Sequence, residues 1–219
     1  MCEDYYEIQK MMAIAELRGN GIQDQHLMDW RFSSAEDSRH IQMGKRYVNN
    51  WATVKENNLG LLFWGGVGSG KSFLAACIAN ALLDQGIPVL MTNFSKVLNR
   101  MGTLYSEERY AYIESFKKYE LLIIDDLGIE RNTDYALEQV YAVIDERYKA
   151  NLPLIVTTNL TTAQLRNPTD VAHARIYSRI LEMCTPVRID CEDRRKAIGS
   201  SKQEQTRKLL FPEVSAGGE

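Results

Sequence analysis

Short apolar runs alternate with amphipathic stretches along most of the chain. The apolar runs predict strands at residues 61–64, 88–92, 121–124, 154–158 and 187–190. Between them, apolar residues recur every three or four positions and predict helices at 71–85, 95–118 with an interruption near Gly102, 135–149 and 173–183. Strands that are apolar throughout and separated by helices are typical of a parallel sheet buried on both faces. We therefore predict an α/β fold with a five-stranded parallel sheet flanked by helices.

The 219 residues suit one sizeable domain with short extensions. Residues 1–30 predict a short helical arm, in which Ile8, Met11, Met12 and Ala15 recur at helical spacing. Residues 31–40 form a polar connector, and 41–54 predict a further helix. We expect one domain over 31–199 and a polar, flexible tail over 200–219.

Composition narrows the function classes. A net charge of −3 and a pI near 5.7 are unlike a strongly basic nucleic-acid protein, so any DNA contact must come from a local patch. No apolar run approaches the ~18 residues of a membrane span, and the acidic N-terminus has no apolar signal core. We expect a cytoplasmic protein without a membrane partner. The cysteines form no CxxC pair and the histidines are scattered, which gives no sign of a disulfide framework or of a metal site built from them.

One glycine-rich segment carries the strongest chemical signal. Residues 65–72 read GGVGSGKS and match G-x-x-x-x-G-K-[ST] in full, between an apolar strand and an amphipathic helix. Backbone N–H groups of such a loop wrap phosphates, its lysine reaches the β- and γ-phosphates, and its serine holds Mg²⁺. The sequence therefore predicts an ATP site with Mg²⁺, formed by Gly65, Gly66, Val67, Gly68, Ser69, Gly70, Lys71, Ser72 and Phe73.

Two further strands end in polar side chains. Asp125 and Asp126 follow the apolar run 121–124, at the carboxyl edge where ligands bind to parallel sheets. We expect Asp125 to support Mg²⁺ with Ser72, and Asp126, on the other side of the strand, to face an attacking water. Asn159 follows the run 154–158 and is placed to orient water against the γ-phosphate, although an asparagine that opens a turn explains it equally well.

Two arginines are candidates for action on a neighbouring subunit. Arg175 and Arg179 lie four residues apart on a predicted helix and share a face, and Ile176, Ile180 and Met183 would anchor that helix. Forked cations in such a position suit a phosphate across a subunit boundary. The alternative is a solvated face on which Arg179 pairs with Glu182.

Together these segments resemble the AAA+ ATPases, and within them the DnaC-like bacterial and phage helicase loaders. The resemblance covers roughly residues 30 to 195 and rests on LLFWGGVGSGKSFLAACIANALL, VLMTNFSKVL, LLIIDDLG, LIVTTNL and RIYSRILEMC in this order. It implies that Lys71 and Ser72 are the Walker A pair, Asp125 the Walker B magnesium carboxylate and Asn159 sensor 1. It also implies that Asp126 is the catalytic carboxylate, with slow hydrolysis, and that Arg179 is the arginine finger with Arg175 as its neighbour. Only 60 residues follow Asn159, so no full helical lid domain is expected.

The resemblance further implies that the protein loads a ring-shaped replicative helicase onto single-stranded DNA. ATP binding would drive self-assembly through the ATP sites, and hydrolysis would drive release. Mixed cationic and aromatic groups suit single strands, and the candidates for DNA contacts are Phe94, Lys96, Arg100 and Tyr105.

Three other readings stay open. An IstB-like transposition helper shares the ATPase core but has a transposase as its partner. A small-molecule kinase needs an acceptor pocket and a mobile arginine-bearing lid, neither of which is clear in the sequence. A nucleotide-dependent scaffold that does not hydrolyse ATP is compatible with an aspartate at position 126.

Overall fold

The structure is a computed structural model and describes residues 2–22, 24–128, 133–190 and 203–211. The strands are β1 (Gly60–Trp64), β2 (Val89–Asn93), β3 (Leu121–Leu127), β4 (Leu154–Thr158) and β5 (Cys184–Arg188). The helices are α1 (Cys2–Gly21), α2 (Gln25–Met28), α3 (Arg39–Asn49), α4 (Trp51–Glu56), α5 (Lys71–Asp84), α6 (Phe94–Met101), α7 (Ser106–Ser115), α8 (Asp134–Lys149), α9 (Thr162–Arg166) and α10 (Val171–Met183), with 3₁₀ turns η1 (Phe32–Ser34) and η2 (Phe116–Lys118).

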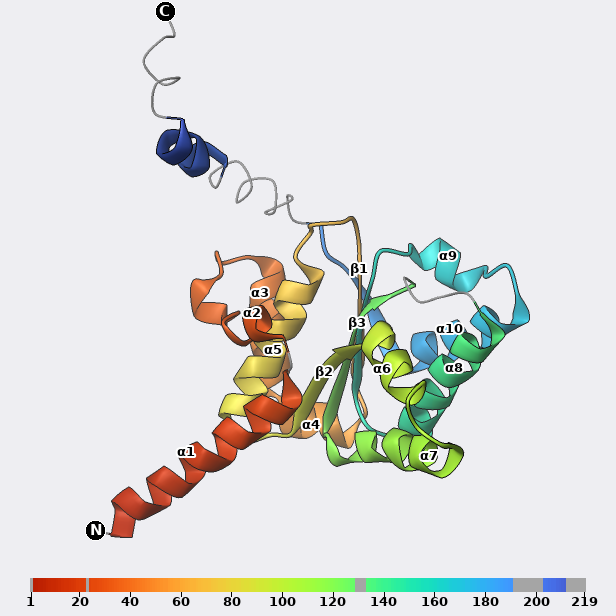
Figure 1. The fold of residues 1–219 in the computed structure, drawn as a ribbon, viewed down its shortest axis with the longest axis horizontal. Helices are drawn as coiled ribbons and strands as arrows, with labels where there is room; N and C mark the ends of the chain where they lie inside the picture. The colour runs from red at the N-terminus through yellow and green to blue at the C-terminus, as the bar shows by residue number, and fades with distance from the viewer. Residues whose placement is uncertain (1, 23, 129–132, 191–202, 212–219) are drawn as a thin grey trace, which may run out of the picture.

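The five strands form one parallel sheet in the order β2-β3-β4-β1-β5. Residues of each central strand alternate between two cores. In β3, Leu121 and Ile123 join the core under α2–α5, and Leu122 and Ile124 join the core under α6 and α8–α10. Figure 1 shows these two groups of helices on opposite faces of the sheet. The predicted fold class is confirmed.

Three local features differ from the predictions. The helix expected over 41–54 is broken at Asn50, whose side chain donates to the Arg46 carbonyl at 2.8 Å and so competes with helix continuation. The last strand spans Cys184–Arg188 rather than 187–190. Pro186 is tolerated there because β5 is an edge strand that pairs only with β1. The short helix α9 has no counterpart among the predicted elements.

The first half of α1 (Cys2–Gly21) has an apolar face that is exposed to solvent. Ile8, Met11 and Met12 are each more than half exposed, and Figure 1 shows this end of α1 projecting from the domain. The arm joins the domain at its other end, where Ile22 is fully buried. Arg18 there bonds to Asp84 of α5. The apolar core therefore begins before residue 31, where we expected the domain to start.

Of the predicted tail 200–219, the structure describes only residues 203–211. Residues 203–210 form a helix with exposed side chains, and the rest of the tail lies outside the described residues. Among the described residues, no helix combines the length and the apolar character needed to cross a bilayer.

Candidate ATP site

The phosphate loop lies between β1 and α5, as its sequence context predicts. Gly70 precedes α5 with a φ of 94°, a left-handed conformation that favours glycine. A Cβ at Gly65 would stand 2.3 Å from the carbonyl oxygen of Ile189, so the loop also needs glycine where it passes the chain after β5. The two glycines fix the path of the backbone around the start of α5, where N–H groups favour an anion.

Two features of the loop fit a bound phosphate chain. The Ser69 hydroxyl is buried and has no hydrogen-bond partner among the described residues. No atom lies within 4 Å of the positions that a Cβ would take at Gly66 and Gly70, so the loop has open space beside its backbone. An unsatisfied buried hydroxyl next to open space suits an oxygen-rich ligand.

Lys71 lies inside the loop rather than on its surface. Its side chain is nearly buried, and Nζ donates to the carbonyl oxygens of Gly65 at 3.0 Å and Gly66 at 2.7 Å. Nζ also donates to Oδ1 of Asn159 at 2.8 Å. The structure thus brings together the loop lysine and the polar residue that ends β4, although 88 residues separate them.

Asp125 lies beside the start of α5. Its carboxylate accepts hydrogen bonds from the Ser72 hydroxyl and from the Thr157 hydroxyl, the latter at 2.6 Å. Burial raises the pKa of Asp125 above its usual value, and the two hydroxyls oppose this rise. A hydroxyl and a carboxylate are hard oxygen ligands of the kind that Mg²⁺ takes alongside ATP phosphates, so Ser72 and Asp125 fit that ion.

The regular alternation expected at Asp126 does not hold. β3 and β4 change register between Ile124 and Leu127, and Asp126 has a φ of 56°. The two aspartates therefore do not follow the simple in-and-out pattern from which we placed Asp126 on the opposite side of the strand.

The remaining loop residues lie around this centre. Val67 is 67% exposed, and the Phe73 ring packs at 5.5 Å from that of Trp30, between centroids. Asn159 itself is exposed at the end of β4. Sequence reasoning did not find Thr157, because a threonine in a strand gives no signal of its own.

The two arginines lie on α10 against α8. The Arg179 guanidinium contacts Asp145 at 2.7 Å and the Tyr141 hydroxyl at 3.1 Å, and its carbon lies 4.5 Å from the centre of the Tyr148 ring. The Arg175 guanidinium carbon lies 4.4 Å from the centre of the Tyr141 ring. Among the described residues, the ion pair of Arg179 is with Asp145 rather than with Glu182, whose carboxylate accepts from the Tyr148 hydroxyl at 2.8 Å.

The candidates for DNA contacts divide into two groups. Phe94 is 2% exposed and packs in the core, so a stacking role for its ring was a wrong prediction. Its apolar side chain serves to hold α6 on the sheet. Lys96 bonds to Asp24 at 2.6 Å, whereas Arg100 is exposed and Tyr105 is 82% exposed. Arg100 and Tyr105 thus remain accessible to a strand.

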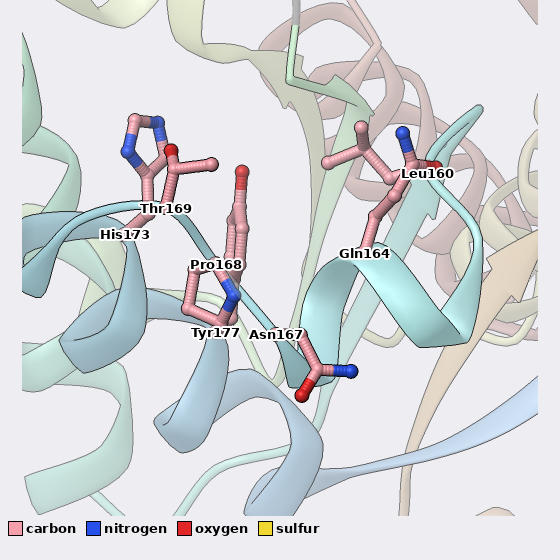
Figure 2. A pocket seen from close by; sticks show the side chains of 7 residues that line it. All are labelled: Leu160, Gln164, Asn167, Pro168, Thr169, His173 and Tyr177. Atoms are coloured by element: carbon pink, nitrogen blue, oxygen red, sulfur yellow. The ribbon is translucent and has the colours of Figure 1, made fainter.

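A hollow of about 280 Å³ lies just beyond Asn159. It is lined by Leu160, Gln164, Asn167, Pro168, Thr169, His173 and Tyr177. Figure 2 shows His173 and Tyr177 of α10 on one side of it and Leu160 and Gln164 on the other. His173 is held by Asp170, with 2.6 Å between Nδ1 and Oδ2. None of the predicted site residues lines this hollow.

Comparison with known proteins decides the family. The model of the protein family described as "IstB-like ATP binding protein" matches residues 3–202, which is most of the chain. This protein belongs to the IstB-like ATP-binding family. With the phosphate loop at residues 65–72, this match makes it an ATP-binding P-loop protein.

Curated relatives include replicative helicase loaders. The chain is 26% identical over 147 residues to the replicative helicase loader DnaI of Bacillus subtilis, covering 62% of this chain and 47% of DnaI. It is 27% identical over 145 residues to the replicative helicase loader DnaC of Escherichia coli, covering 64% and 56%. It is 31% identical over 154 residues to the phage-like element PBSX protein XkdC of Bacillus subtilis, covering 64% and 54%. The chain spans about half the length of these relatives.

Solved structures support the same fold. A crystal structure of the DnaC helicase loader superposes with a TM-score of 0.64 at 24% identity, covering 76% of this chain and all of that one. A crystal structure of DnaI gives a TM-score of 0.63 at 23% identity, covering 78% and 93%. The resemblance to DnaC-like AAA+ proteins drawn from the sequence motifs is thus confirmed.

Proposed function

We propose that this protein is an ATPase that loads a ring-shaped replicative helicase onto single-stranded DNA. The observation that carries the ATPase part is the meeting of Lys71 with Asn159 and of Ser72 with Asp125 at one edge of the sheet. The similarity to DnaI and DnaC supports the loader part. ATP binding would assemble subunits side by side, and slow hydrolysis would release them.

Each residue of the site has a role in binding or hydrolysing ATP under this proposal. Mg²⁺, held by Ser72 and Asp125, would neutralise charge that develops on the phosphates. Lys71 binds the β- and γ-phosphates, and Asn159, now bonded to Lys71, orients water at the γ-phosphate once nucleotide draws the lysine away. Asp126 assists that water, and its short side chain is consistent with slow turnover.

The first prediction concerns Lys71. Lys71→Ala should lower ATP affinity by about 100-fold or more, which corresponds to losing one or two hydrogen bonds to a charged group. The melting temperature should change little, since Nζ of Lys71 bonds to backbone carbonyl oxygens of the loop itself and to Asn159, which is exposed at the end of β4. Isothermal calorimetry measures the affinity, and intrinsic tryptophan fluorescence gives a second readout, since Trp64 directly precedes the loop.

Lys45→Ala, which removes a lysine of α3 outside the loop, is the control and should bind ATP normally. If Lys71→Ala kept wild-type ATP affinity, the phosphate loop would not be the nucleotide site. If wild-type protein bound no ATP at all, the proposed function itself would be lost.

The second prediction concerns DNA. A short single-stranded oligonucleotide should bind more tightly in ATP than in ADP, because assembly needs the γ-phosphate. Replacing both Arg100 and Tyr105 by alanine should weaken this binding by about 10-fold, in line with one stacking contact and one phosphate contact. Fluorescence anisotropy at fixed salt measures both effects. Arg46→Ala, on α3 across the sheet, is the charge-matched control. Equal affinity in ATP and ADP would contradict nucleotide-driven assembly on DNA.

A second candidate function is an IstB-like transposition helper, which the family description favours. The ATP site would work in the same way, and the partner would be a transposase. Gel filtration of the ATP-bound protein with a purified replicative helicase, and separately with a transposase, distinguishes the two. Comigration with the helicase that requires ATP supports the loader, and comigration only with the transposase supports the helper.

A further inference from the structure

The strand that carries both aspartates contains a bulge. Ile124 pairs with Val156 and Leu127 pairs with Thr158, so two residues of β3, Asp125 and Asp126, lie opposite the single residue Thr157. Asp126 has a φ of 56°, which residues other than glycine adopt rarely, although aspartate and asparagine tolerate it best. Bulges of this kind redirect side chains and are common beside active sites.

Two threonine hydroxyls replace the hydrogen bonds that the bulge removes from the ladder. The backbone N–H of Asp126 donates to Oγ1 of Thr157 at 2.9 Å, and Oγ1 of Thr158 donates to the carbonyl oxygen of Leu127 at 2.7 Å. Both threonines are fully buried. The backbone groups that the bulge leaves unpaired in the ladder are thus satisfied by side chains of the neighbouring strand.

Thr157 also contacts Asp125, the carboxylate that we expect to support Mg²⁺. Its single hydroxyl proton is donated to Oδ1 of Asp125 at 2.6 Å, so the same oxygen accepts from Asp126 and donates to Asp125. One hydroxyl thereby fixes the rotamer of the first aspartate and the backbone of the second. A valine has the same shape but can make neither bond.

We propose that Thr157 is a positioning residue, which orients Asp125 toward Mg²⁺ and holds the bulge that places Asp126. This inference rests on the proposed ATPase function. Groups that hydrogen-bond to metal ligands set the ligand's direction, and their removal costs about 10–100-fold in metal affinity or activity. Thr157 acts through the aspartates and does not itself touch the nucleotide.

The first test separates Mg²⁺ binding from nucleotide binding. Thr157→Val should leave the affinity for ATP without Mg²⁺ near the wild-type value, because the phosphate loop is intact. The Mg²⁺ concentration that gives half of the metal-dependent gain in ATP affinity should rise about 10-fold or more, and turnover should fall about 10–100-fold. Calorimetry and intrinsic tryptophan fluorescence report the binding, so the result does not depend on activity alone. Thr157→Ser, which keeps the hydroxyl, should restore Mg²⁺ dependence to within about 3-fold of wild type, an allowance for context.

The matched control is Thr92→Val, the same replacement at a buried threonine of β2, where it faces Ile124. It should keep the wild-type Mg²⁺ dependence. If Thr157→Val behaved like Thr92→Val, or if Thr157→Ser failed to restore Mg²⁺ dependence, the positioning role would be overturned. Absence of ATP binding in wild-type protein would instead remove the proposed function and is visible in the same titration.

The second test examines the bulge in the protein without ligand and stays informative if Thr157→Val does not fold. At a left-handed position glycine is less strained than alanine, so Asp126→Gly should melt about 2–4 °C above Asp126→Ala. Glu138, exposed on α8, provides the control. There Glu138→Ala should melt above Glu138→Gly, because alanine is the better helix former. If Asp126→Ala melted at or above Asp126→Gly, the left-handed bulge, and with it the role of Thr157, would be wrong.

Discussion

Replacing Arg147 by methionine should lower the free energy of unfolding by about 3–5 kcal/mol, because several buried backbone carbonyl oxygens lose their hydrogen-bond donor at once. Arg147 is 2% exposed at the end of α8. Burial lowers the pKa of its guanidinium to about 9, which leaves the group charged at neutral pH. A loss of this size is a large part of the total stability of a typical domain, about 5–15 kcal/mol.

The reason for this cost lies in what Arg147 holds. Its guanidinium donates to the backbone carbonyl oxygens of Phe116, Tyr119, Glu120 and Pro153, at distances of 2.6–3.3 Å. These residues come just before β3 and β4, so one side chain ties the starts of both strands to α8. Without Arg147, these carbonyl oxygens at the amino ends of β3 and β4 lose their donor. Each unsatisfied buried group costs about 1–3 kcal/mol.

Urea denaturation measures the change in stability. Arg147→Lys should recover only part of it, because an ammonium has three donors and lacks the planar fork that reaches these carbonyls. Lys55→Met removes the exposed ion pair of Lys55 with Glu120 and should change stability by less than about 1 kcal/mol. A loss below 1 kcal/mol for Arg147→Met would mean that water or a local shift satisfies the carbonyls equally well.

The sequence predicts the sheet well because its strands are apolar on both faces. Each of the five strands exists, and the central strands alternate between the two cores as a buried parallel sheet requires. The shift of β5 arises from tertiary context. Its proline argues against a strand in isolation and becomes acceptable only at the edge of the sheet.

The candidate site is predictable where chemistry and position coincide. Parallel strands bring their carboxyl ends to one edge of the sheet. Asp125 and Asn159 lie at or just after such ends, and the loop after β1 brings Lys71 and Ser72 to the same edge. Thr157 and Arg147 act through contacts with residues distant in sequence, which no local pattern encodes. The bulge at Asp126 likewise depends on the register between two strands.

Replacing Arg179 by alanine should leave ATP binding at a single site nearly intact and reduce turnover by about 10³–10⁵-fold, the contribution of an arginine finger in other nucleotide hydrolases. Within the single subunit, the Arg179 guanidinium forms an ion pair with Asp145, a hydrogen bond to Tyr141 and a cation–π contact with Tyr148. A partly exposed ion pair contributes about 0.2–1 kcal/mol, and a cation–π contact about 0.5–1 kcal/mol. A 10³–10⁵-fold rate effect corresponds to about 4–7 kcal/mol of transition-state stabilisation, so the transition state in a neighbour's site would outcompete the contacts on α8.

Subunit mixing tests whether Arg179 acts across a boundary. Arg179→Ala protein supplies an intact phosphate loop and Lys71→Ala protein supplies an intact arginine, so their mixture should regain ATP turnover that neither has alone. Arg175→Ala is the matched variant, since Arg175 is the exposed neighbour that stacks on Tyr141. If Arg179→Ala alone kept wild-type turnover while Arg175→Ala lost it, and only the latter regained activity with Lys71→Ala protein, Arg175 would be the finger. Arg179 would then only fasten α10 to α8, and its removal should lower the melting temperature without changing turnover.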